Sequence, residues 1–545
     1  MITLKTILSN SLLFASCLYG TIRWRKATHR VASVQARYLQ EVLAKNAETT
    51  FGREHGFSTI HNIRDYQQHV QVREFTEMEP YIQRMAAGER DVLTADQVKS
   101  FALSSGSSAA SKMIPYTPSL LCDFRRGITP WMGGLFLEYP SLLLGQSYWQ
   151  VSPVGTDAGM SSGGIRIGFG EDSEYFGPFR GALVRATLAV PEHVAGIAEM
   201  DSFRFETLSH LLACDNLRFI SIWNPSFFTL LLAEVRKLLP SLLLKIGIDG
   251  SAKRARQLQR LFNEYSGADF TQRNRSGHTL GEAIWPKLRV ISCWSDAGAR
   301  EAALRLKAAF PSAAIQPKGL LATEGMMSLP WRAEGSALAI CSHFFEFVET
   351  GTDTPRLAHE LETGRTYAIL LTTSGGFYRY RIGDLVEVTG WIDQCPLLRF
   401  RGKENGVSDM VGEKLNGLHA VRAAEELLSR YGTQPTFWML APEHGEPAPC
   451  YTLYIQSQSA VPRELISELD AELRKNFHYA YAQRLGQLCP LKLFVIDPES
   501  SPELDYMQAQ AARGRRMGGI KRQQFEQIPG WSTVFRKDVK STSLT

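Results

Sequence analysis

A serine- and glycine-rich segment that ends in a lysine, Ser104–Lys112, has the composition of a phosphate-binding loop. It follows the short apolar run Phe101–Leu103, which is typical of a strand that enters a loop. Gly106 permits a tight turn that directs backbone N–H groups inward, and the hydroxyl and ammonium groups add donors for phosphate oxygens. The segment lacks the glycine, lysine and hydroxyl spacing of a Walker A loop. A flexible surface loop is the alternative, because such loops are often rich in serine.

Two further segments have residues that suit a nucleotide. In Ala322–Gly325, Glu324 follows an apolar run, where a carboxylate can hold a Mg2+ ion that bridges phosphates. The alternative is a helix N-terminus with Thr323 as its cap. In Tyr378–Val386, Asp384 follows a glycine and precedes a predicted strand, so its carboxylate can accept hydrogen bonds from both ribose hydroxyls. The alternative is a hairpin turn capped by Asp384, but the Tyr and Arg residues around it favour a function.

Two C-terminal segments contain lysines that could stabilise charge on a reacting phosphate. The first runs from Arg401 to Asn405 and continues through Ser408 to Glu413 and Lys414. The second is Gly518–Lys521, in which a lysine follows glycines. Taken alone, each segment also fits a solvated charged surface.

The elements that must position these residues alternate between strand and helix. This alternation favours an α/β architecture, followed by a more β-rich part. The predicted strands are Phe101–Leu103, Leu217–Trp223, Leu288–Trp294, Ala337–Phe347, Thr366–Thr372 and Leu385–Thr389. The predicted helices are Val34–Asn46, Phe227–Leu239 and Ala299–Phe310.

The composition and pattern of the sequence change near residue 400. The segment Arg399–Asn416 is charged, contains glycine and lacks clear periodicity. We interpret this segment as a hinge. Beyond it the pattern predicts a small α+β domain, made of helices 419–431 and 462–477 and strands 436–440, 451–456 and 491–496. We therefore predict a large N-terminal domain, residues 1–408, and a small mobile C-terminal domain, residues 409–545.

Composition excludes some classes of protein and bounds others. A chain of 545 residues usually folds as at least two units with their own cores. The net charge of +5 is small for this length, and no long basic run interleaved with aromatics indicates a nucleic-acid partner. The eight cysteines contain no CxxC pair, so we expect neither a structural zinc site nor a disulfide framework. Reduced thiols indicate a reducing, cytoplasmic compartment.

The N-terminal stretch Ile7–Ile22 is fairly apolar and is followed by four basic residues, Arg23, Arg25, Lys26 and Arg30. It is short for a bilayer-spanning helix, and serines and an asparagine interrupt it. The basic residues follow the apolar run, whereas a secretory signal carries them before it. We expect an amphipathic first helix that packs on the body of the protein. Export or membrane anchoring is the alternative, which a faint lipoprotein-like pattern at Phe14–Cys17 supports.

Taken together and in chain order, these segments resemble the Gretchen Hagen (auxin-responsive promoter) family of acyl-acid amido synthetases, in a bacterial-type member. The resemblance covers nearly the whole chain, and so many segments at family spacing make it specific. Further matching segments are Val34-Gln35, Thr50–Arg53, Gly88-Glu89, Ile114–Thr117, Trp223–Phe227, Trp285–Leu288, Ile291–Trp294 and Phe344–Phe347.

The resemblance implies an adenylate-forming, firefly-luciferase-like fold with a large N-terminal α/β lobe and a small mobile α+β lobe. It also implies a ligase that forms carbon–nitrogen bonds with ATP and Mg2+. A carboxylate first attacks the α-phosphate of ATP, which gives an acyl-adenylate and pyrophosphate. The amine of an amino acid then attacks the acyl carbon and releases AMP.

The same resemblance assigns roles by position. It implies that Glu324 holds Mg2+, that Lys414 is the hinge lysine near the nucleotide, and that Lys521 closes over the phosphates during adenylation; both lysines would be catalytic. The nucleotide-binding residues that it implies are Ser104, Ser105, Ser107, Ser108, Thr323, Glu324, Asp384 and Lys414.

The sequence departs from the family pattern at three places. Ser107 stands where threonine is commoner, Ala109-Ala110 stand where glycines are common, and the basic-proline segment after Lys521 is poorly matched. Arg125 and Arg126 could pair with a substrate carboxylate or form a solvated helix face.

Two alternative functions remain open from the sequence. The adenylated acyl group could pass to a thiol such as that of coenzyme A, since adenylation needs the same residues. The chain could also be a non-catalytic, membrane-associated relative. The motifs bind nucleotide, so the acid, the amine and the oligomeric state stay open.

Overall fold

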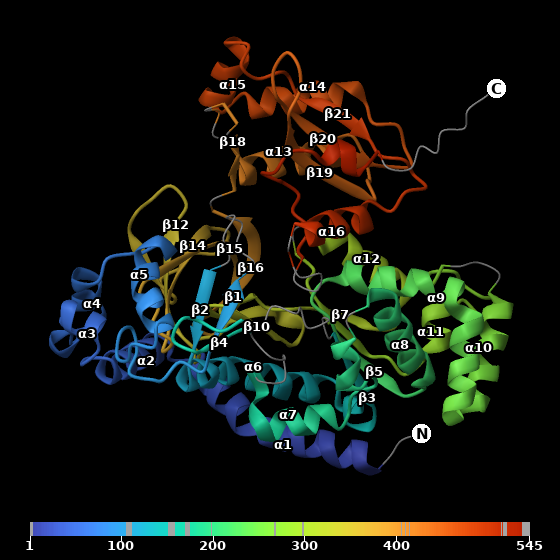
Figure 1. Cartoon of the computed structure of the whole chain (residues 1–545), viewed down its shortest axis with the longest axis horizontal. Coiled ribbons are helices and arrows are strands. Elements are labelled where there is room, and N and C mark those ends of the chain that lie inside the picture. Colours follow the sequence, from blue (N-terminus) through green and yellow to red (C-terminus); the bar gives the residue numbers. More distant parts are fainter. Residues whose placement is uncertain are drawn as a thin grey trace. The chain divides into compact units, whose positions relative to one another are not determined.

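The structure is a computed structural model, and its elements are labelled in Figure 1. It describes residues 4–104, 112–150, 159–168, 175–197, 199–265, 269–296, 299–404, 406–408, 410–411, 413, 415–513, 515 and 520–536. The chain divides into two compact units. Unit 1 consists of Met1–Ser295, Ala302–Ile382 and Val386–Phe400, and unit 2 consists of Asp296–Glu301, Gly383–Leu385 and Arg401–Thr545.

The segment from Leu4 to Ala86 is mostly helical and packs on the rest of unit 1, and it includes the predicted helix Val34–Asn46, which runs from Val31 to Lys45. The expected first helix is present and runs further at both ends than the apolar stretch Ile7–Ile22. In the described part of the chain, no helix combines the length and the apolar character that crossing a bilayer requires. The elements are α1 (Leu4–Ala27), α2 (Val31–Lys45), α3 (Thr50–Glu54), η1 (Phe57–Thr59), α4 (Ile63–His69) and α5 (Phe75–Ala86).

A parallel sheet of four strands, in the order β3-β5-β6-β7, forms one half of unit 1. Its two central strands are buried on both faces, which is usual for parallel sheets covered by helices. Ile220 and Ile291 face one hydrophobic cluster, whereas their neighbours Phe219 and Val290 face another that includes α6. The strands are β3 (Gln146–Trp149), β5 (Leu217–Ser221), β6 (Val290–Cys293) and β7 (Ala314–Pro317).

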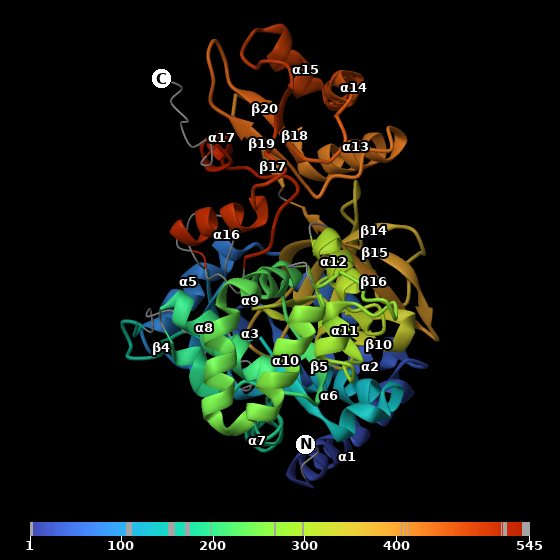
Figure 2. The same ribbon diagram turned by 90° about the vertical axis from the view of Figure 1, so that its right-hand side faces the viewer.

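Helices connect and cover these strands, as Figure 2 shows for α8, α9, α10 and α11. The long helix α6 begins with Thr117, whose side chain accepts a hydrogen bond from the backbone N–H of Leu120, and with Pro118 in its first turn. The elements are α6 (Pro118–Glu138), η2 (Pro140–Leu144), α7 (Gly177–Arg185), η4 (Glu192–Gly196), α8 (Met200–Ala213), α9 (Pro225–Ile246), η5 (Gly247–Ser251), α10 (Ala252–Glu264), α11 (Leu280–Ile284) and α12 (Arg300–Ala309).

A second sheet joins seven strands in the order β10-β11-β16-β15-β14-β12-β13. The prediction of a single strand over Ala337–Phe347 is wrong, because the chain turns at Ala339, whose carbonyl accepts a hydrogen bond from the N–H of Ser342. The predicted strand Leu385–Thr389 is only the middle of β15. The elements are β10 (Ser328–Trp331), η7 (Arg332–Glu334), β11 (Gly335–Leu338), β12 (Phe344–Glu349), β13 (Pro355–Leu357), β14 (Thr366–Thr372), β15 (Tyr380–Ile392) and β16 (Cys395–Lys403).

Two small sheets complete unit 1. One has the order β2-β1-β4, and the other is the hairpin β8–β9. Both are short, and both carry segments that the sequence assigns to nucleotide binding. The strands are β1 (Ser100–Ser104), β2 (Lys112–Tyr116), β4 (Arg166–Ile167), β8 (Leu321–Ala322) and β9 (Gly325–Met326).

Unit 2 is the small α+β fold that the sequence predicts, with its own hydrophobic core. Its main sheet has the order β19-β20-β21, and helix α13 begins with Asn416, whose side chain accepts from the N–H groups of Leu418 and His419. The predicted hinge is partly regular, because β16 extends to Lys403. The elements are β17 (Val407–Ser408), β18 (Leu415–Asn416), α13 (Gly417–Arg430), β19 (Phe437–Glu443), β20 (Cys450–Gln456), α14 (Arg463–Leu473), α15 (Phe477–Arg484), β21 (Lys492–Val495), α16 (Pro502–Ala512) and α17 (Trp531–Val534).

Candidate functional site

The β1–β2 hairpin holds the two ends of the predicted phosphate loop together. Ser104 and Lys112 are register partners in the antiparallel pair, so the loop between them starts and ends at one point. The Lys112 ammonium donates to the Tyr380 hydroxyl at 3.3 Å and lies over the Phe75 ring. The backbone of Ser104 ends β1, whereas Ser105, Ser107 and Ser108 lie outside the described residues.

The second nucleotide segment is a tight turn between β8 and β9. The prediction of a helix N-terminus is therefore wrong, and Thr323 and Glu324 are the two residues of the turn. The Tyr116 hydroxyl donates to the carbonyl oxygen of Thr323 at 2.8 Å, which ties the turn to β2. Glu324 is buried, with 6% of its surface exposed.

His343 fixes the other side of this turn. Its Nε2 atom accepts a hydrogen bond from the backbone N–H of Met326 at 3.1 Å. A Cβ atom added to Gly325 would lie 2.8 Å from that Nε2 atom, so the close approach requires glycine. Burial and, to a smaller extent, the charge of Arg126 lower the pKa of His343 to about 3. The ring is therefore neutral and able to accept at neutral pH.

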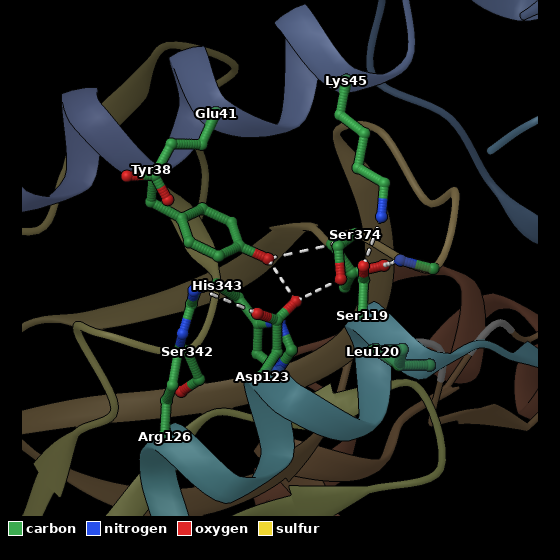
Figure 3. A network of polar contacts seen from close by, with 12 residues as sticks. Tyr38, Glu41, Lys45, Ser119, Leu120, Asp123, Arg126, Ser342, His343 and Ser374 are labelled. Atoms are coloured by element: carbon green, nitrogen blue, oxygen red, sulfur yellow. Dashed lines mark hydrogen bonds and ion pairs between the residues drawn. The ribbon is translucent and has the colours of Figure 1, made fainter. Parts of the chain in front are cut away.

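A buried polar network surrounds Asp123 in the second turn of α6, as Figure 3 shows. Asp123 accepts hydrogen bonds from the hydroxyls of Tyr38, at 2.6 Å, and Ser374, and Arg126 donates to it at 3.2 Å. The Nδ1 atom of His343 lies 3.9 Å from the same carboxylate. Burial raises the pKa of Asp123 to about 6, although the hydrogen bonds and the charge of Arg126 oppose the rise. The network joins α2, α6 and the residues beside the β8–β9 turn.

This network is absent from the sequence prediction, because its members lie far apart along the chain. The one available signal is an aspartate in a mostly apolar helical segment. Arg126, for which the sequence left a solvated face or a substrate carboxylate open, pairs with Asp123 on its own helix.

Asp384 lies inside β15 and not in a hairpin turn, so the alternative reading of that segment is wrong. Gly383, with a φ of 78°, gives the strand a local irregularity just before it. Asp384 is 3% exposed, and its Oδ1 atom lies 2.5 Å from the Nζ atom of Lys403 on β16. The structure therefore brings together Asp384 and Lys403, which come from two different segments that the sequence singled out.

The tyrosines and arginine before Asp384 support the sheet. Arg379 is buried and makes two hydrogen bonds to the Glu346 carboxylate, at 2.9 and 3.0 Å. The Tyr378 hydroxyl donates to the carbonyl of Leu93 at 2.7 Å. These side chains, whose density suggested a function, hold the strand that carries Asp384.

Of the two predicted catalytic lysines, Lys521 belongs to the described residues and Lys414 does not. Lys414 lies outside the described residues, but its neighbour Glu413 is buried and accepts from the Tyr451 hydroxyl at 2.6 Å. Lys521 follows the buried Ile520 in unit 2. The carbonyl oxygen of Lys521 accepts a hydrogen bond from the Tyr506 hydroxyl at 3.4 Å.

An aromatic cluster at the carboxyl edge of the parallel sheet is a further candidate site. Trp223 follows β5, Trp294 follows β6, and their ring centroids lie 5.6 Å apart. The Nζ atom of Lys318, which follows β7, lies 3.8 Å from the centroid of Trp223. Ligands of open α/β sheets bind at this edge. The signal was in the sequence, since Trp223 and Trp294 end two predicted strands.

The comparisons with known proteins agree on one family. Residues 22–315 match the GH3 family N-terminal domain, and residues 336–403 match the GH3 family central domain. Indole-3-acetic acid-amido synthetase GH3.4 of Arabidopsis thaliana is 26% identical over 174 residues, which is 30% of this chain and 29% of that protein. Probable indole-3-acetic acid-amido synthetase GH3.2 of Oryza sativa subsp. japonica is 37% identical over 83 residues, or 14% of each chain. The chain thus spans less than a third of the length of these curated relatives.

Solved structures confirm the predicted adenylate-forming fold. The structure of AtGH3.15 acyl acid amido synthetase in complex with 2,4-DB has a TM-score of 0.78 at 18% identity and covers 96% of both chains. A 2-hydroxyisobutyryl-CoA ligase in the postadenylation state has a TM-score of 0.53 at 12% identity, over 94% of this chain and 91% of that one. With domain matches over more than half of its length, the chain belongs to the GH3 family.

Proposed function

We propose that the chain is an ATP-dependent acyl-acid amido synthetase, which adenylates a carboxylic acid and transfers the acyl group to an amino acid. The observation that carries the proposal is the buried Asp384 carboxylate, paired with Lys403 in the sheet of the matched central domain. A carboxylate that is fixed in a strand is suited to accept hydrogen bonds from the two hydroxyls of a ribose.

In the first half-reaction, the substrate carboxylate attacks the α-phosphate of ATP and displaces pyrophosphate. Ser104, Ser105, Ser107 and Ser108 bind the phosphates in this proposal. The β1–β2 hairpin supports that role, because it closes the loop at Ser104 and Lys112. Lys521 and Lys414 stabilise the negative charge that the two anions bring together. We also propose the predicted division into a large domain, 1–408, and a small mobile domain, 409–545.

The residues around the β8–β9 turn fit a Mg2+ ion. Mg2+ prefers hard oxygen ligands and commonly binds one or two carboxylates together with substrate phosphates. Glu324 supplies such a carboxylate, held by the turn that Tyr116 and His343 fix. A bound Mg2+ ion would offset phosphate charge during adenylation.

The acyl acid binds, in our proposal, at the aromatic cluster of Trp223, Trp294 and Lys318. Flat indole faces suit an aromatic or other planar acid, and an ammonium group suits its carboxylate. Lys318 also lies only five residues before Thr323, so the same stretch of chain serves acid and nucleotide. In the second half-reaction, the amine attacks the acyl carbon and AMP leaves, with no covalent acyl-enzyme.

The proposed compartment is the cytoplasm. All eight cysteines are free thiols, which is usual for a reducing compartment.

The deciding experiment is acid-dependent exchange of pyrophosphate into ATP, over a panel of aryl, indolyl and fatty acids with Mg2+. Exchange with any acid, abolished in Asp384→Ala, would establish adenylation. Product analysis with amino acids and with coenzyme A then separates an amide from a thioester product. A folded chain that neither exchanges nor binds ATP would be a non-catalytic relative, and the proposal would be wrong.

A further inference from the structure

The outward face of α1 is a continuous apolar stripe. Leu4, Leu8, Leu12, Tyr19 and Ile22 are between 51% and 76% exposed, although they are large hydrophobic residues. They follow one another at helical spacing, together with the exposed Ala15, so they share one side of the helix. From Leu4 to Ile22 the stripe is about 27 Å long. Contiguous exposed apolar surface of this kind marks an interaction site.

The inward face of the same helix combines polar and apolar residues. Asn10 is buried and donates from its side-chain amide to the carbonyls of Leu142 and Gly145, at 3.2 and 2.9 Å. Thr6, Ser9 and Thr21 are buried on this face as well. Leu13, Cys17 and Trp24 are buried on the same side and belong to the hydrophobic core. The helix therefore packs on the protein through a face of mixed character, and Leu4, Leu8 and Leu12 remain outside it.

Exposed apolar side chains continue onto the elements that contact α1. These elements are α6, η2 and α7. Figure 1 shows α6 and α7 beside α1 at the edge of unit 1. They carry the exposed residues Leu137, Leu144 and Phe179. The elements that contact α1 thus also expose large apolar side chains.

The charges on this helix all have one sign. The first acidic residue of the chain is Glu41, whereas Lys5, Arg23 and Lys26 are exposed on α1. Lys26 continues the stripe by one more turn after Ile22, and Lys5 and Arg23 flank it. Arg25 also belongs to α1, and its guanidinium group donates a hydrogen bond to the carboxylate of Asp393. A second copy of this face would bring like charges together, whereas an anionic surface would be attracted.

We propose that α1 docks the protein on an anionic lipid surface, with the stripe in the interface and the basic residues toward the headgroups. An apolar face with basic flanks is the combination by which helices lie in the plane of a membrane. Basic residues near an anionic leaflet add to the binding, and the ring of Tyr19 suits the interfacial region. The inference concerns this surface of unit 1 and does not depend on the proposed function.

The test is flotation of the full chain with vesicles of phosphatidylcholine alone or with added phosphatidylserine. We expect binding to the anionic vesicles, weakened by salt. The double variant Leu8→Glu/Leu12→Glu should bind at least about tenfold more weakly. Arg23→Glu/Lys26→Glu should lose the preference for phosphatidylserine.

The matched control is Leu244→Glu/Ile248→Glu, which changes two exposed apolar residues elsewhere in unit 1 and should bind as the unchanged chain does. Thermal melts establish that each variant is folded. The proposal is wrong if no vesicle binds the chain, or if the α1 and control variants bind equally. It is also wrong if light scattering shows a dimer that Leu8→Glu/Leu12→Glu converts to a monomer, because a second copy would then cover the stripe.

Discussion

The Nε2 atom of His343 accepts a hydrogen bond from the backbone N–H of Met326, directly after the turn that holds Thr323 and Glu324. This bond connects the buried network around Asp123 to the proposed nucleotide site. His343 is thus a positioning residue, because it acts on the turn and through it on Glu324.

His343→Leu should remove the acceptor and leave the Met326 N–H buried and unsatisfied. We expect a loss of about 2–3 kcal/mol in the free energy of unfolding, measured by urea denaturation. The Mg2+ concentration required for adenylation should also rise. His343→Gln places a carbonyl oxygen near the same N–H and should restore most of both properties. Equal behaviour of the two variants would show that the hydrogen bond does not position the turn.

Asp123 should make stability depend on pH. Its folded pKa is raised from 3.8 to about 6 by burial, so its favourable contribution is complete below 3.8 and is lost as pH rises through about 6. Asn cannot ionise, so Asp123→Asn should gain stability relative to the unchanged chain as pH rises from about 4 to about 7, by about 2 °C in Tm. Scanning calorimetry across this range checks the trend. The exposed Asp353→Asn should show no such gain, and a gain of the same size there would contradict the assignment.

Asp384→Ala should weaken ATP binding at least about tenfold, because the proposed ribose ligand is lost. Lys403, which is half exposed, can turn to solvent in the variant, so the fold should persist. Isothermal titration with ATP measures the change. The control is Asp393→Ala, which lies at the other end of the β15–β16 pair. If Asp384→Ala binds ATP with unaltered affinity, Asp384 is not a ribose ligand.

Lys521→Ala should slow adenylation by about 10²-fold while ATP affinity changes little, since the lysine would stabilise charge that develops during the reaction. Single-turnover formation of the acyl-adenylate separates this step from binding. Lys475→Ala, an exposed lysine of the same unit, serves as the matched control. If Lys521→Ala adenylates at the normal rate, the assignment of this lysine is wrong.

Trp223→Leu and Lys318→Met should raise the KM for the acid about tenfold and leave the affinity for ATP unchanged, because both touch the acid in the proposal. Acid titrations of pyrophosphate exchange provide the KM values. Trp391→Leu, a partly exposed tryptophan outside the cluster, should keep the normal KM. If these two variants instead change the affinity for ATP, the aromatic cluster belongs to the nucleotide site and not to the acid site.

Local signals in the sequence determined the family, the α/β class, the strand Thr366–Thr372, and a strand from Leu217 that was predicted to reach Trp223 and ends at Ser221. Such signals are enough where a short apolar run between polar turns allows only one element. The same signals singled out Glu324 and Asp384 as candidate site residues, because loop and strand motifs keep their spacing along the chain. They failed at Ala337–Phe347, where a buried turn interrupts an apolar run that looks continuous.

Only the tertiary structure decided which residues support these motifs. Tyr38, Asp123, His343 and Ser374 are distant in sequence and meet because a buried carboxylate must collect its donors from whatever elements surround it. The tertiary structure also decided the orientation of α1. Its hydrophobic pattern predicts an amphipathic helix, but the pattern alone cannot say which face turns inward. The carbonyls of Leu142 and Gly145 need a donor, and Asn10 supplies it, so the side of α1 that carries Asn10 and Leu13 is buried and Leu8 and Leu12 face out.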